Sequence, residues 1–370
     1  MTFAIPCLFG LERLVADECK RLELPNVRAE NGRVLCDGEA IDIARLNLNL
    51  RCGERVLILL GEFHARSFDQ LFEGVKALPW EDYIPREGAV PVRCRTVDSQ
   101  LHSQPDCQRI VKKAICDRLG AKYGLLQLPE TGAKYSVRLQ LIKDIASLSI
   151  DTTGVGLHKR GYRAVGVDAP LRETLAAALV LLTRYRGKDP LCDPFCGSGT
   201  IPIEAALIAR NRAPGLERSF EAQRWTLAPS RLWLEASDEA MDKEFDGDYE
   251  IWGADADPRA VAIARENIVK AGVEDVVRIE QEDATRFHWG GAYGRVVTNP
   301  PYGERMLERS EAEALYRAFG KATAKLPDTW RLAILSSHTE FERAFGRQAV
   351  KKRKLYNGMI KCDLFFYGPR

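Results

Sequence analysis

The second half of the chain alternates helical patterns with short apolar runs, and this alternation constrains the fold more than any other feature. From Leu171 onward, runs typical of strands begin at positions 191, 249, 276, 295 and 331. Apolar residues recur at helical spacing between them. Strands that alternate with helices are typical of a parallel sheet covered by helices. The 370 residues leave room for this domain and one or two more.

The end of the chain indicates more closely which type of sheet to expect. Asn357-Gly358 separates two strand-like runs, 350–356 and 359–367. Asn-Gly between such runs is a strong hairpin signal. An antiparallel hairpin closing a parallel sheet fits the class I (Rossmann-like) methyltransferase layout better than the dehydrogenase layout. We therefore expect an α/β methyltransferase-type sheet with a C-terminal antiparallel hairpin.

A glycine-containing loop, residues 193–200, follows the first of these strands and opens a helix at 201–209. Gly197 and Gly199 would let the backbone approach a ligand closely. The loop is neither the G-x-G-x-x-G dinucleotide fingerprint nor a phosphate-binding loop, which needs Gly-Lys-Ser/Thr. These differences weigh against NAD and ATP.

Two carboxylates complete the predicted cofactor pocket. Asp255 ends the second strand, where a carboxylate can accept from both ribose hydroxyls of an adenosyl group. Asp283 ends the third strand and can accept from the adenine amine. The glycine loop and these two carboxylates together suit S-adenosylmethionine, because this cofactor has a sulfonium and no phosphate groups that the protein must bind. The alternative is that the glycines form a tight turn and Asp255 caps the helix Pro258–Ala271.

The chemistry is predicted at Asn299-Pro300-Pro301-Tyr302, directly after the strand 295–298. A nucleobase amine is a poor nucleophile, and the Asn299 side-chain carbonyl and the Pro300 backbone carbonyl can both accept from it. Pro300 and Pro301 stiffen the segment, and Tyr302 can stack on a flipped base. These residues predict methyl transfer to an exocyclic base amine, and they fit guanine N2 and adenine N6 equally. A proline turn with a packing tyrosine is the alternative.

The first half reads as two smaller α+β units. Residues 1–60 contain a helical pattern and a strand, and a second unit begins near Ser67, where Ser67-Phe68-Asp69-Gln70 fits a capping box. Another helix is expected from Ser103, and strands at 135–142 and 145–150. The glycine-rich, basic segment 154–163 reads as a linker.

Composition limits the partners, metal sites and cellular location that we expect for the chain. The net charge is +2, so any nucleic-acid surface must be local. None of the 10 cysteines forms a Cys-x-x-Cys pair, so we expect no metal site and reduced thiols. Neither a signal peptide nor an 18-residue apolar run is evident, which predicts a cytoplasmic protein without a membrane span.

In these residues and motifs, the chain resembles the bacterial RNA guanine-N2 methyltransferases that carry a THUMP domain. It is most similar to the N2-methylguanosine-forming half of the large-subunit ribosomal RNA methyltransferase. The resemblance covers the whole chain and rests on these segments: 103–108, 112–115, 151–154, 157–163, 173–178, 193–206 and 299–305. The longer ribosomal enzyme carries a second methyltransferase unit that this chain does not contain.

The resemblance implies a division into a ferredoxin-like domain (1–62), a THUMP domain (63–154), a basic linker (155–168) and a methyltransferase domain (169–370). It implies S-adenosylmethionine as cofactor and methylation of guanine N2 in RNA, with ribosomal RNA favoured over tRNA. Residues carried over to the cofactor are Glu173, Thr174, Asp193, Phe195, Gly197, Gly199, Thr200, Asp255 and Asp283. The rival activities are tRNA guanine-N2 methylation, adenine-N6 methylation and non-catalytic RNA binding or ribosome assembly.

Two basic segments are candidate RNA contacts. His158, Lys159, Arg160 and Arg163 cluster in the linker and can grip phosphates. Lys112-Lys113 lies on the expected THUMP helix. A solvated basic loop or helix explains each segment about as well. Trp225 and Trp233, in the poorly patterned insertion 211–247, receive no predicted function.

Overall fold

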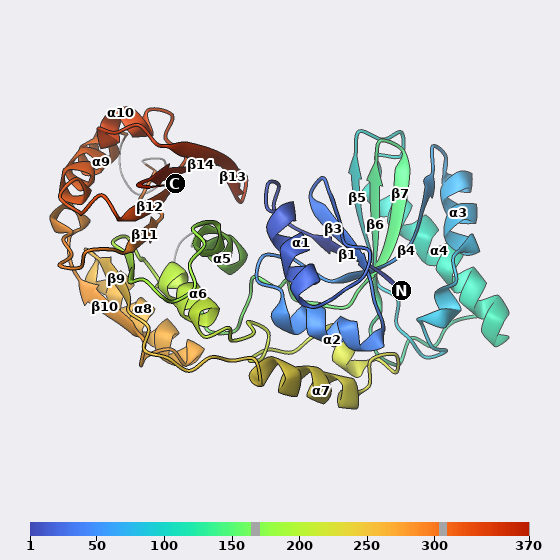
Figure 1. The fold of residues 1–370 in the computed structure, drawn as a ribbon. Helices are drawn as coiled ribbons and strands as arrows, with labels where there is room; N and C mark the ends of the chain where they lie inside the picture. The colour runs from blue at the N-terminus through green and yellow to red at the C-terminus, as the bar shows by residue number, and fades with distance from the viewer. Residues whose placement is uncertain (164–170, 303–308, 370) are drawn as a thin grey trace. The chain divides into compact units, whose positions relative to one another are not determined.

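The computed structural model describes residues 1–163, 171–302 and 309–369. They form two compact units, each built on a seven-stranded sheet (Figure 1). Unit 1 comprises residues 1–7, 15–157 and 218–239, and unit 2 comprises 8–14, 158–217 and 240–370. Residues 164–168 of the predicted linker and 303–305 of the family resemblance lie outside the described residues.

The sheet of unit 1 is continuous across two of the predicted domains. Its order is β2-β3-β1-β4-β7-β6-β5, with only β5 and β6 parallel among the neighbouring pairs. The strands are β1 (Thr2–Pro6), β2 (Arg28–Glu30), β3 (Arg33–Asp37), β4 (Leu57–His64), β5 (Val92–Val97), β6 (Ser136–Ile142) and β7 (Ile145–Asp151). Strand β4 pairs with β1 on one side and β7 on the other, and it runs across the predicted boundary at 62.

Helices cover this sheet at three places where the apolar periodicity predicts them, and also at residues 40–49, for which the sequence pattern predicted none. They are α1 (Glu12–Arg21), α2 (Ala40–Asn49), α3 (Phe68–Ala77) and α4 (Gln104–Tyr123), with a 3₁₀ turn η1 (Trp80–Asp82). Helices α3 and α4 pack side by side (Figure 1). The Ser67 hydroxyl accepts from the Gln70 N–H at 3.2 Å, as the capping pattern predicts. The reciprocal bond differs, because Gln70 Oε1 accepts from Arg66 rather than Ser67.

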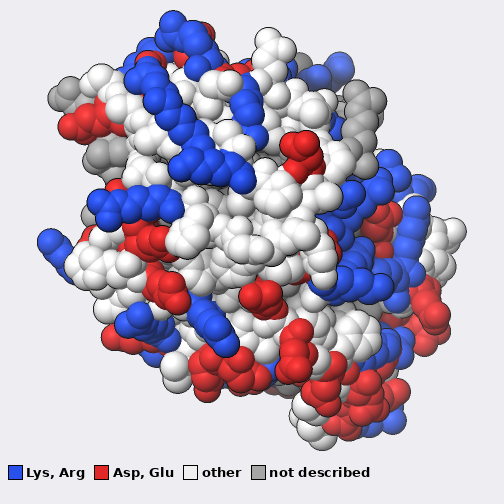
Figure 2. All heavy atoms as spheres, turned by 60° about the vertical axis from the view of Figure 1, so that its left-hand side comes forward, with Lys and Arg blue, Asp and Glu red and all other residues white. Residues whose placement is uncertain are grey.

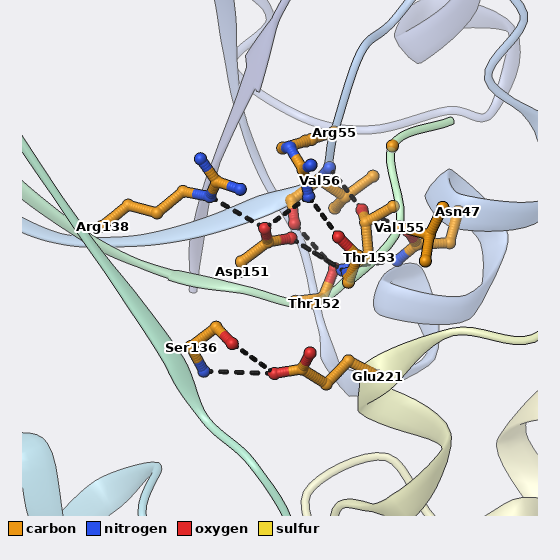
Figure 3. A network of polar contacts seen from close by, with 12 residues as sticks. Asn47, Arg55, Val56, Ser136, Arg138, Asp151, Thr152, Thr153, Val155 and Glu221 are labelled. Atoms are coloured by element: carbon orange, nitrogen blue, oxygen red, sulfur yellow. Dashed lines mark hydrogen bonds and ion pairs between the residues drawn. The ribbon is translucent and has the colours of Figure 1, made fainter. Parts of the chain in front are cut away.

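A buried carboxylate joins the ferredoxin-like and THUMP parts of unit 1 (Figure 3). Asp151 accepts from Arg55 at 2.7 Å and from Arg138 at 2.8 Å, and its other oxygen accepts from the Thr153 N–H at 3.0 Å. Asp151 is 1% exposed. Because the arginines come from both sides of the junction, the segment 151–154 fixes the two parts of unit 1 to each other.

The central part of the insertion that the sequence left without a function, residues 218–239, packs in unit 1. Residues 218–239 include a 3₁₀ turn η2 (Glu221–Arg224) and most of α7 (Ser230–Met241). The Trp225 ring stacks on Tyr135 at 4.6 Å, and its Nε1 donates to the Lys134 carbonyl at 2.7 Å. Glu221 accepts from the Ser136 hydroxyl at 2.7 Å (Figure 3). These contacts give the insertion a packing role.

Unit 2 has a mixed sheet in the order β10-β9-β8-β11-β12-β14-β13, parallel except for β14, which is antiparallel to both neighbours. Its strands are β8 (Leu191–Asp193), β9 (Ile251–Asp255), β10 (Val277–Gln281), β11 (Arg295–Thr298), β12 (Arg331–Ser336), β13 (Lys351–Asn357) and β14 (Ile360–Tyr367). Gly358 turns the hairpin with a φ of 64°. The predicted parallel sheet with a C-terminal hairpin is confirmed.

The helices of unit 2 are α5 (Glu173–Leu182), α6 (Thr200–Ala209), α8 (Pro258–Ala271), α9 (Arg309–Thr323) and α10 (Phe341–Phe345), with a 3₁₀ turn η3 (Ala284–Arg286). Apolar packing against β11 and β12 includes the buried rings of Trp330, Phe319 and Phe341. None of the helices in the described ranges is long and apolar enough to cross a membrane. Within those same ranges, no group of three His, Cys, Asp or Glu side chains has the geometry of a metal site.

Candidate active site

The predicted site residues follow the ends of four neighbouring strands. Strands β10, β9, β8 and β11 are parallel, so their carboxyl ends meet at one edge of the sheet. The loop 193–200 leaves β8, Asp255 ends β9 and Asn299 follows β11. In sheets wound with helices, ligands bind at this edge. The structure therefore brings the predicted cofactor loop and the predicted catalytic segment together.

The loop after β8 is closed by backbone contacts that leave room for a ligand. Gly197 and Gly199 have φ of 52° and 80°, a region that favours glycine. The Cys196 N–H donates to the Ala254 carbonyl at 2.8 Å, and the Gly197 N–H donates to Asp255 Oδ2 at 3.0 Å. A Cβ added to Gly197 would meet no atom within 4 Å. The loop thus presents bare backbone to open space beside a carboxylate, which fits an adenosyl group.

Asp193, for which the resemblance implies a cofactor contact, is buried between the loop after β8 and the end of β11. Its side chain is 1% exposed, and Oδ1 accepts from the Thr298 hydroxyl at 2.6 Å and from the Phe195 N–H at 3.2 Å. Burial raises the pKa of the Asp193 carboxyl to about 7, although both hydrogen bonds act in the opposite direction. The carboxyl therefore joins two parts of the site, the loop after β8 and the end of β11.

The other predicted cofactor residues divide into exposed and packed groups. Asp283 is exposed, and it caps η3 by accepting from the Thr285 N–H at 2.8 Å. Phe195 packs edge-on against Phe319 at 5.1 Å between ring centroids. Thr174 is fully buried. Asp283 can reach a ligand at the sheet edge, whereas Phe195 and Thr174 form part of the surrounding wall.

The Asn-Pro-Pro-Tyr segment is held from two directions. The Tyr302 hydroxyl donates to Asn299 Oδ1, and the Tyr316 hydroxyl donates to the Pro301 carbonyl at 2.5 Å. Asn299 is half-buried, and Pro300 is buried. A carbonyl oxygen has two lone pairs, so Asn299 Oδ1 can accept from Tyr302 and from one further donor. The segment therefore presents a fixed acceptor at the edge where the cofactor loop lies.

The linker residue Arg163 contacts the starts of two helices. Its Nε lies 3.2 Å from Glu173 Oε1, at the first residue of α5. Its Nη2 donates to Thr200 Oγ1 at 3.0 Å, at the first residue of α6, and to the Leu171 carbonyl at 2.8 Å. Burial raises the pKa of the Glu173 carboxyl, and Arg163 lowers it. Arg163 thus holds together helix ends that were predicted to line the cofactor pocket.

Arg160 is enclosed as well. It is 3% exposed, and its Nε lies 3.5 Å from Glu204 Oε1, on a side chain that is fully buried. The Tyr162 hydroxyl donates to the same carboxyl oxygen at 3.0 Å. In this structure Arg160 cannot reach a phosphate, because its guanidinium is enclosed beside a buried carboxylate. We therefore withdraw Arg160 as an RNA contact, and we assign Arg163 to the helix ends. Of the linker cations, Lys159 is exposed and His158 is half-buried.

The THUMP lysines border an open groove of ≈ 810 Å³ between α4 and the edge strand β5. Its charged lining residues are Arg109, Lys112, Lys113, Lys134 and Glu130. Lys112 pairs with Glu130 and donates to the Val90 carbonyl at 2.9 Å, so its charge is partly neutralised. Lys113 is exposed, with Nζ 5.6 Å from the centre of the Phe72 ring. Arg109 and Lys134, which sequence reasoning missed, are also exposed.

Charge is distributed unevenly over the surface. On the face drawn in Figure 2, Lys and Arg gather in the upper part, whereas the lower edge is rich in Asp and Glu. The C-terminal hairpin carries the exposed side chains Lys351, Lys352, Lys354 and Lys361. A net charge near zero therefore conceals local basic surfaces.

Models of three known domains match the chain in the order that the sequence predicts. The RMKL-like methyltransferase domain matches residues 160–365, the RlmL ferredoxin-like domain matches 2–57 and the THUMP domain matches 65–151. The chain belongs to the RMKL-like methyltransferase family. The predicted fold class, the family and the assignment as an S-adenosylmethionine-dependent methyltransferase are thereby confirmed.

Two relatives illustrate the family. YpsC of Bacillus subtilis (strain 168), which its name places among RNA methyltransferases, is 45% identical over 361 residues, covering 97% of this chain and 93% of its own. The ribosomal RNA large subunit methyltransferase K/L of Marinobacter nauticus is 35% identical over 380 residues, covering 99% of this chain but 52% of its own. The chain therefore spans about half the length of the K/L enzyme.

Solved structures agree on the fold. A protein from Listeria monocytogenes described as a predicted N6-adenine-specific DNA methylase has a TM-score of 0.94 at 46% identity, covering 100% of this chain and 96% of its own. SMU.472, a methyltransferase by its name and crystallised with SAH, has a TM-score of 0.95 at 42% identity, covering 100% and 98%. TrmN from Thermus thermophilus, at 22% identity and a TM-score of 0.70, shows the fold alone.

Proposed function

We propose that this RMKL-like methyltransferase transfers a methyl group from S-adenosylmethionine to the exocyclic N2 amine of a guanine in RNA, with ribosomal RNA as the substrate. The observation that carries the proposal is the position of Asn299. It follows β11 at the sheet edge where β8 opens into the glycine loop, and its side-chain carbonyl is fixed by Tyr302. When bound, the cofactor supplies an electrophilic methyl group.

The cofactor is assigned to the residues that remain accessible at this edge. Gly197 would let the loop backbone approach it, Asp255 would accept from the ribose hydroxyls and Asp283 from the adenine amine. Gly199, which is buried against Ala264, would serve the turn into α6. Glu173, Thr174, Asp193, Phe195 and Thr200 would support the pocket walls. The resemblance implied instead that the segment Glu173-Thr174 closes over the cofactor and that the other residues hold it.

The acceptor base is assigned to the segment 299–302. Asn299 Oδ1 and the Pro300 carbonyl would accept from the base amine and direct its lone pair toward the methyl group. Tyr302 would stack on the base and also orient Asn299 through its hydroxyl. Because no strong base is needed to remove the proton after transfer, alignment and electrostatics supply the catalysis.

RNA is assigned to the groove of unit 1, with Arg109, Lys113 and Lys134 as the exposed phosphate contacts. Lys112 contributes through the same groove although Glu130 offsets part of its charge. Lys159 and His158 are secondary candidates in the linker. The ribosomal RNA substrate rests on the name of the K/L relatives, which are twice as long as this chain.

Methyl transfer to a panel of substrates tests the proposal. The protein is incubated with isotope-labelled S-adenosylmethionine and unmodified ribosomal RNA, tRNA or DNA, and the digested nucleosides are identified by mass spectrometry. The proposal predicts labelled N2-methylguanosine from ribosomal RNA. Labelled N6-methyladenine would instead support the adenine activity by which the Listeria relative is described. The guanosine product from tRNA would keep the chemistry and change the partner.

Asn299→Ala separates chemistry from binding. The variant is expected to lose at least about 100-fold in rate, because the amine loses its acceptor in the transition state. Its affinity for S-adenosylmethionine, measured by calorimetry, is expected to stay within about threefold of the parent. Unchanged turnover would remove Asn299 from the catalytic role.

A further inference from the structure

One buried hydrogen bond connects the cofactor loop to the catalytic segment. Thr298 is the last residue of β11, Asp193 is the last residue of β8, and the two strands are parallel neighbours. The Thr298 hydroxyl donates to Asp193 Oδ1 at 2.6 Å. Thr298 is fully buried and Asp193 is 1% exposed, so water does not compete for this bond.

The same carboxyl oxygen also holds the loop. Asp193 Oδ1 accepts from the Phe195 N–H at 3.2 Å, two residues into the segment that leads to Gly197. A shift of the loop start relative to β11 would therefore break one of two bonds to a single atom. Because the carboxyl is enclosed, a broken bond would leave a buried polar group without its partner, which is costly.

Asn299 has little freedom to move independently of this bond. It is the next residue after Thr298, and the two prolines that follow it have restricted φ. On the far side, the Tyr316 hydroxyl holds the Pro301 carbonyl at 2.5 Å. The Asn299 acceptor is thus anchored by Thr298 before it and by Pro301 after it. Misplacement of a reacting group by about 1 Å can cost about 100-fold in rate.

We propose that Thr298 is a positioning residue for methyl transfer, whose hydroxyl fixes the Asn299 acceptor relative to the cofactor loop through Asp193. This inference rests on the proposed function, and it assigns a role to a residue for which the sequence gave none. Thr298 touches neither the base nor the cofactor in this role. Its loss should therefore reduce the rate of the chemical step more than the affinity for either substrate.

The test compares Thr298→Val, which keeps the shape and removes the hydroxyl, with Thr298→Ser, which keeps the hydroxyl. Thr323→Val is the matched control, because Thr323 is 1% exposed and its hydroxyl donates to the Phe319 carbonyl at 3.0 Å within α9. Single-turnover rates are measured at saturating S-adenosylmethionine and ribosomal RNA. Calorimetry gives the cofactor affinity, and thermal unfolding gives the stability of each variant.

Thr298→Val is expected to slow the single-turnover step at least about tenfold while the cofactor affinity changes less than about threefold. Thr298→Ser should restore most of the rate. Thr323→Val should lower the melting temperature without slowing transfer. A Thr298→Val variant that reaches the parent rate once the cofactor is saturating would overturn the proposal, because the bond would then serve cofactor binding alone.

Failure of the proposed function and failure of the role of Thr298 give different experimental results. A parent protein that makes N2-methylguanosine, with a Thr298→Val variant equally fast, removes the role of Thr298 and keeps the proposed function. A parent protein that transfers no methyl group to any nucleic acid removes the proposed function and, with it, any reaction for Thr298 to position.

Discussion

The groove of unit 1 and the linker segment 158–163 are both basic, yet the structure gives their cations different surroundings. In the groove, Arg109, Lys113 and Lys134 are exposed beside a hollow of ≈ 810 Å³. In the linker, Arg160 and Arg163 lie against the carboxylates of Glu204 and Glu173. Burial beside a carboxylate separates the two sets, because Arg109 also pairs with a carboxylate, that of Asp106, yet stays exposed to a ligand.

A basic run in a sequence therefore indicates charge, but it does not indicate whether the side chains are exposed to a ligand. The carboxylate beside Arg160 lies 44 residues further along the chain, in the second turn of α6. Nothing in the spacing of residues 158–163 indicates such a distant partner. Lysine and arginine also differ here, because the planar guanidinium suits buried pairs whereas the ammonium is more strongly hydrated.

The largest expected effect is on stability, from Arg160→Ala. The substitution would leave the fully buried Glu204 carboxylate without this guanidinium, which typically costs about 3–5 kcal/mol. Denaturant unfolding measures the loss. Lys159→Ala, one residue away and exposed, should change the free energy of unfolding by less than about 0.5 kcal/mol. Equal effects of the two substitutions on the free energy of unfolding would contradict the distinction between an enclosed cation and an exposed one.

The next effect is on RNA binding, from the triple replacement of Arg109, Lys113 and Lys134 by Gln. Each lost phosphate contact should reduce the slope of log K against log salt by about 0.7–0.9. We expect a loss of at least about tenfold in RNA affinity at low salt, with little change in melting temperature. RNA affinity is measured by filter binding over a salt series. An unaltered slope would place the RNA elsewhere.

A smaller expected effect is the pH dependence of the stability that Arg163→Ala loses. Burial raises the pKa of Glu173 above its ordinary value, and Arg163 opposes that shift. Without Arg163 the folded-state pKa of Glu173 should rise further. A carboxyl with a raised folded pKa stabilises the fold at acidic pH and loses that contribution as pH rises through the folded pKa. Arg163→Ala should therefore destabilise the protein more at pH 8 than at pH 5.

Thermal unfolding of the parent and Arg163→Ala at both pH values checks this sign. Adding Glu173→Gln to Arg163→Ala should remove most of the pH dependence of the difference, because the titrating group is gone. A difference that is larger at pH 5, or that persists in the double variant, would mean that another group governs the effect.

Much of the fold of unit 2 could be predicted, because its signals are local. The strand 295–298 and the helix Pro258–Ala271 have the predicted bounds, and Asn357-Gly358 turns the predicted hairpin. The sheet edge that gathers Asp193, Asp255 and Asn299 follows from strand order once the family layout is assumed.

The remaining features depend on contacts between distant residues. The stacking of Trp225 on Tyr135 joins positions 90 residues apart, so the poorly patterned insertion gave no sign that it packs in unit 1. The sharing of strand β4 between two predicted domains is a matter of sheet pairing, which periodicity does not report. The hydrogen bond to Asp193 likewise comes from a distant residue, Thr298, 105 positions away.

A paired titration tests most directly whether the groove of unit 1 binds RNA and whether Arg163 supports the cofactor domain. Affinities for ribosomal RNA and for S-adenosylmethionine are measured for the parent, the triple groove variant and Arg163→Ala. We predict that the groove variant loses at least about tenfold in RNA affinity and keeps its cofactor affinity, and that Arg163→Ala shows the reverse. Loss of RNA affinity in Arg163→Ala, with the groove variant unchanged, would contradict both assignments.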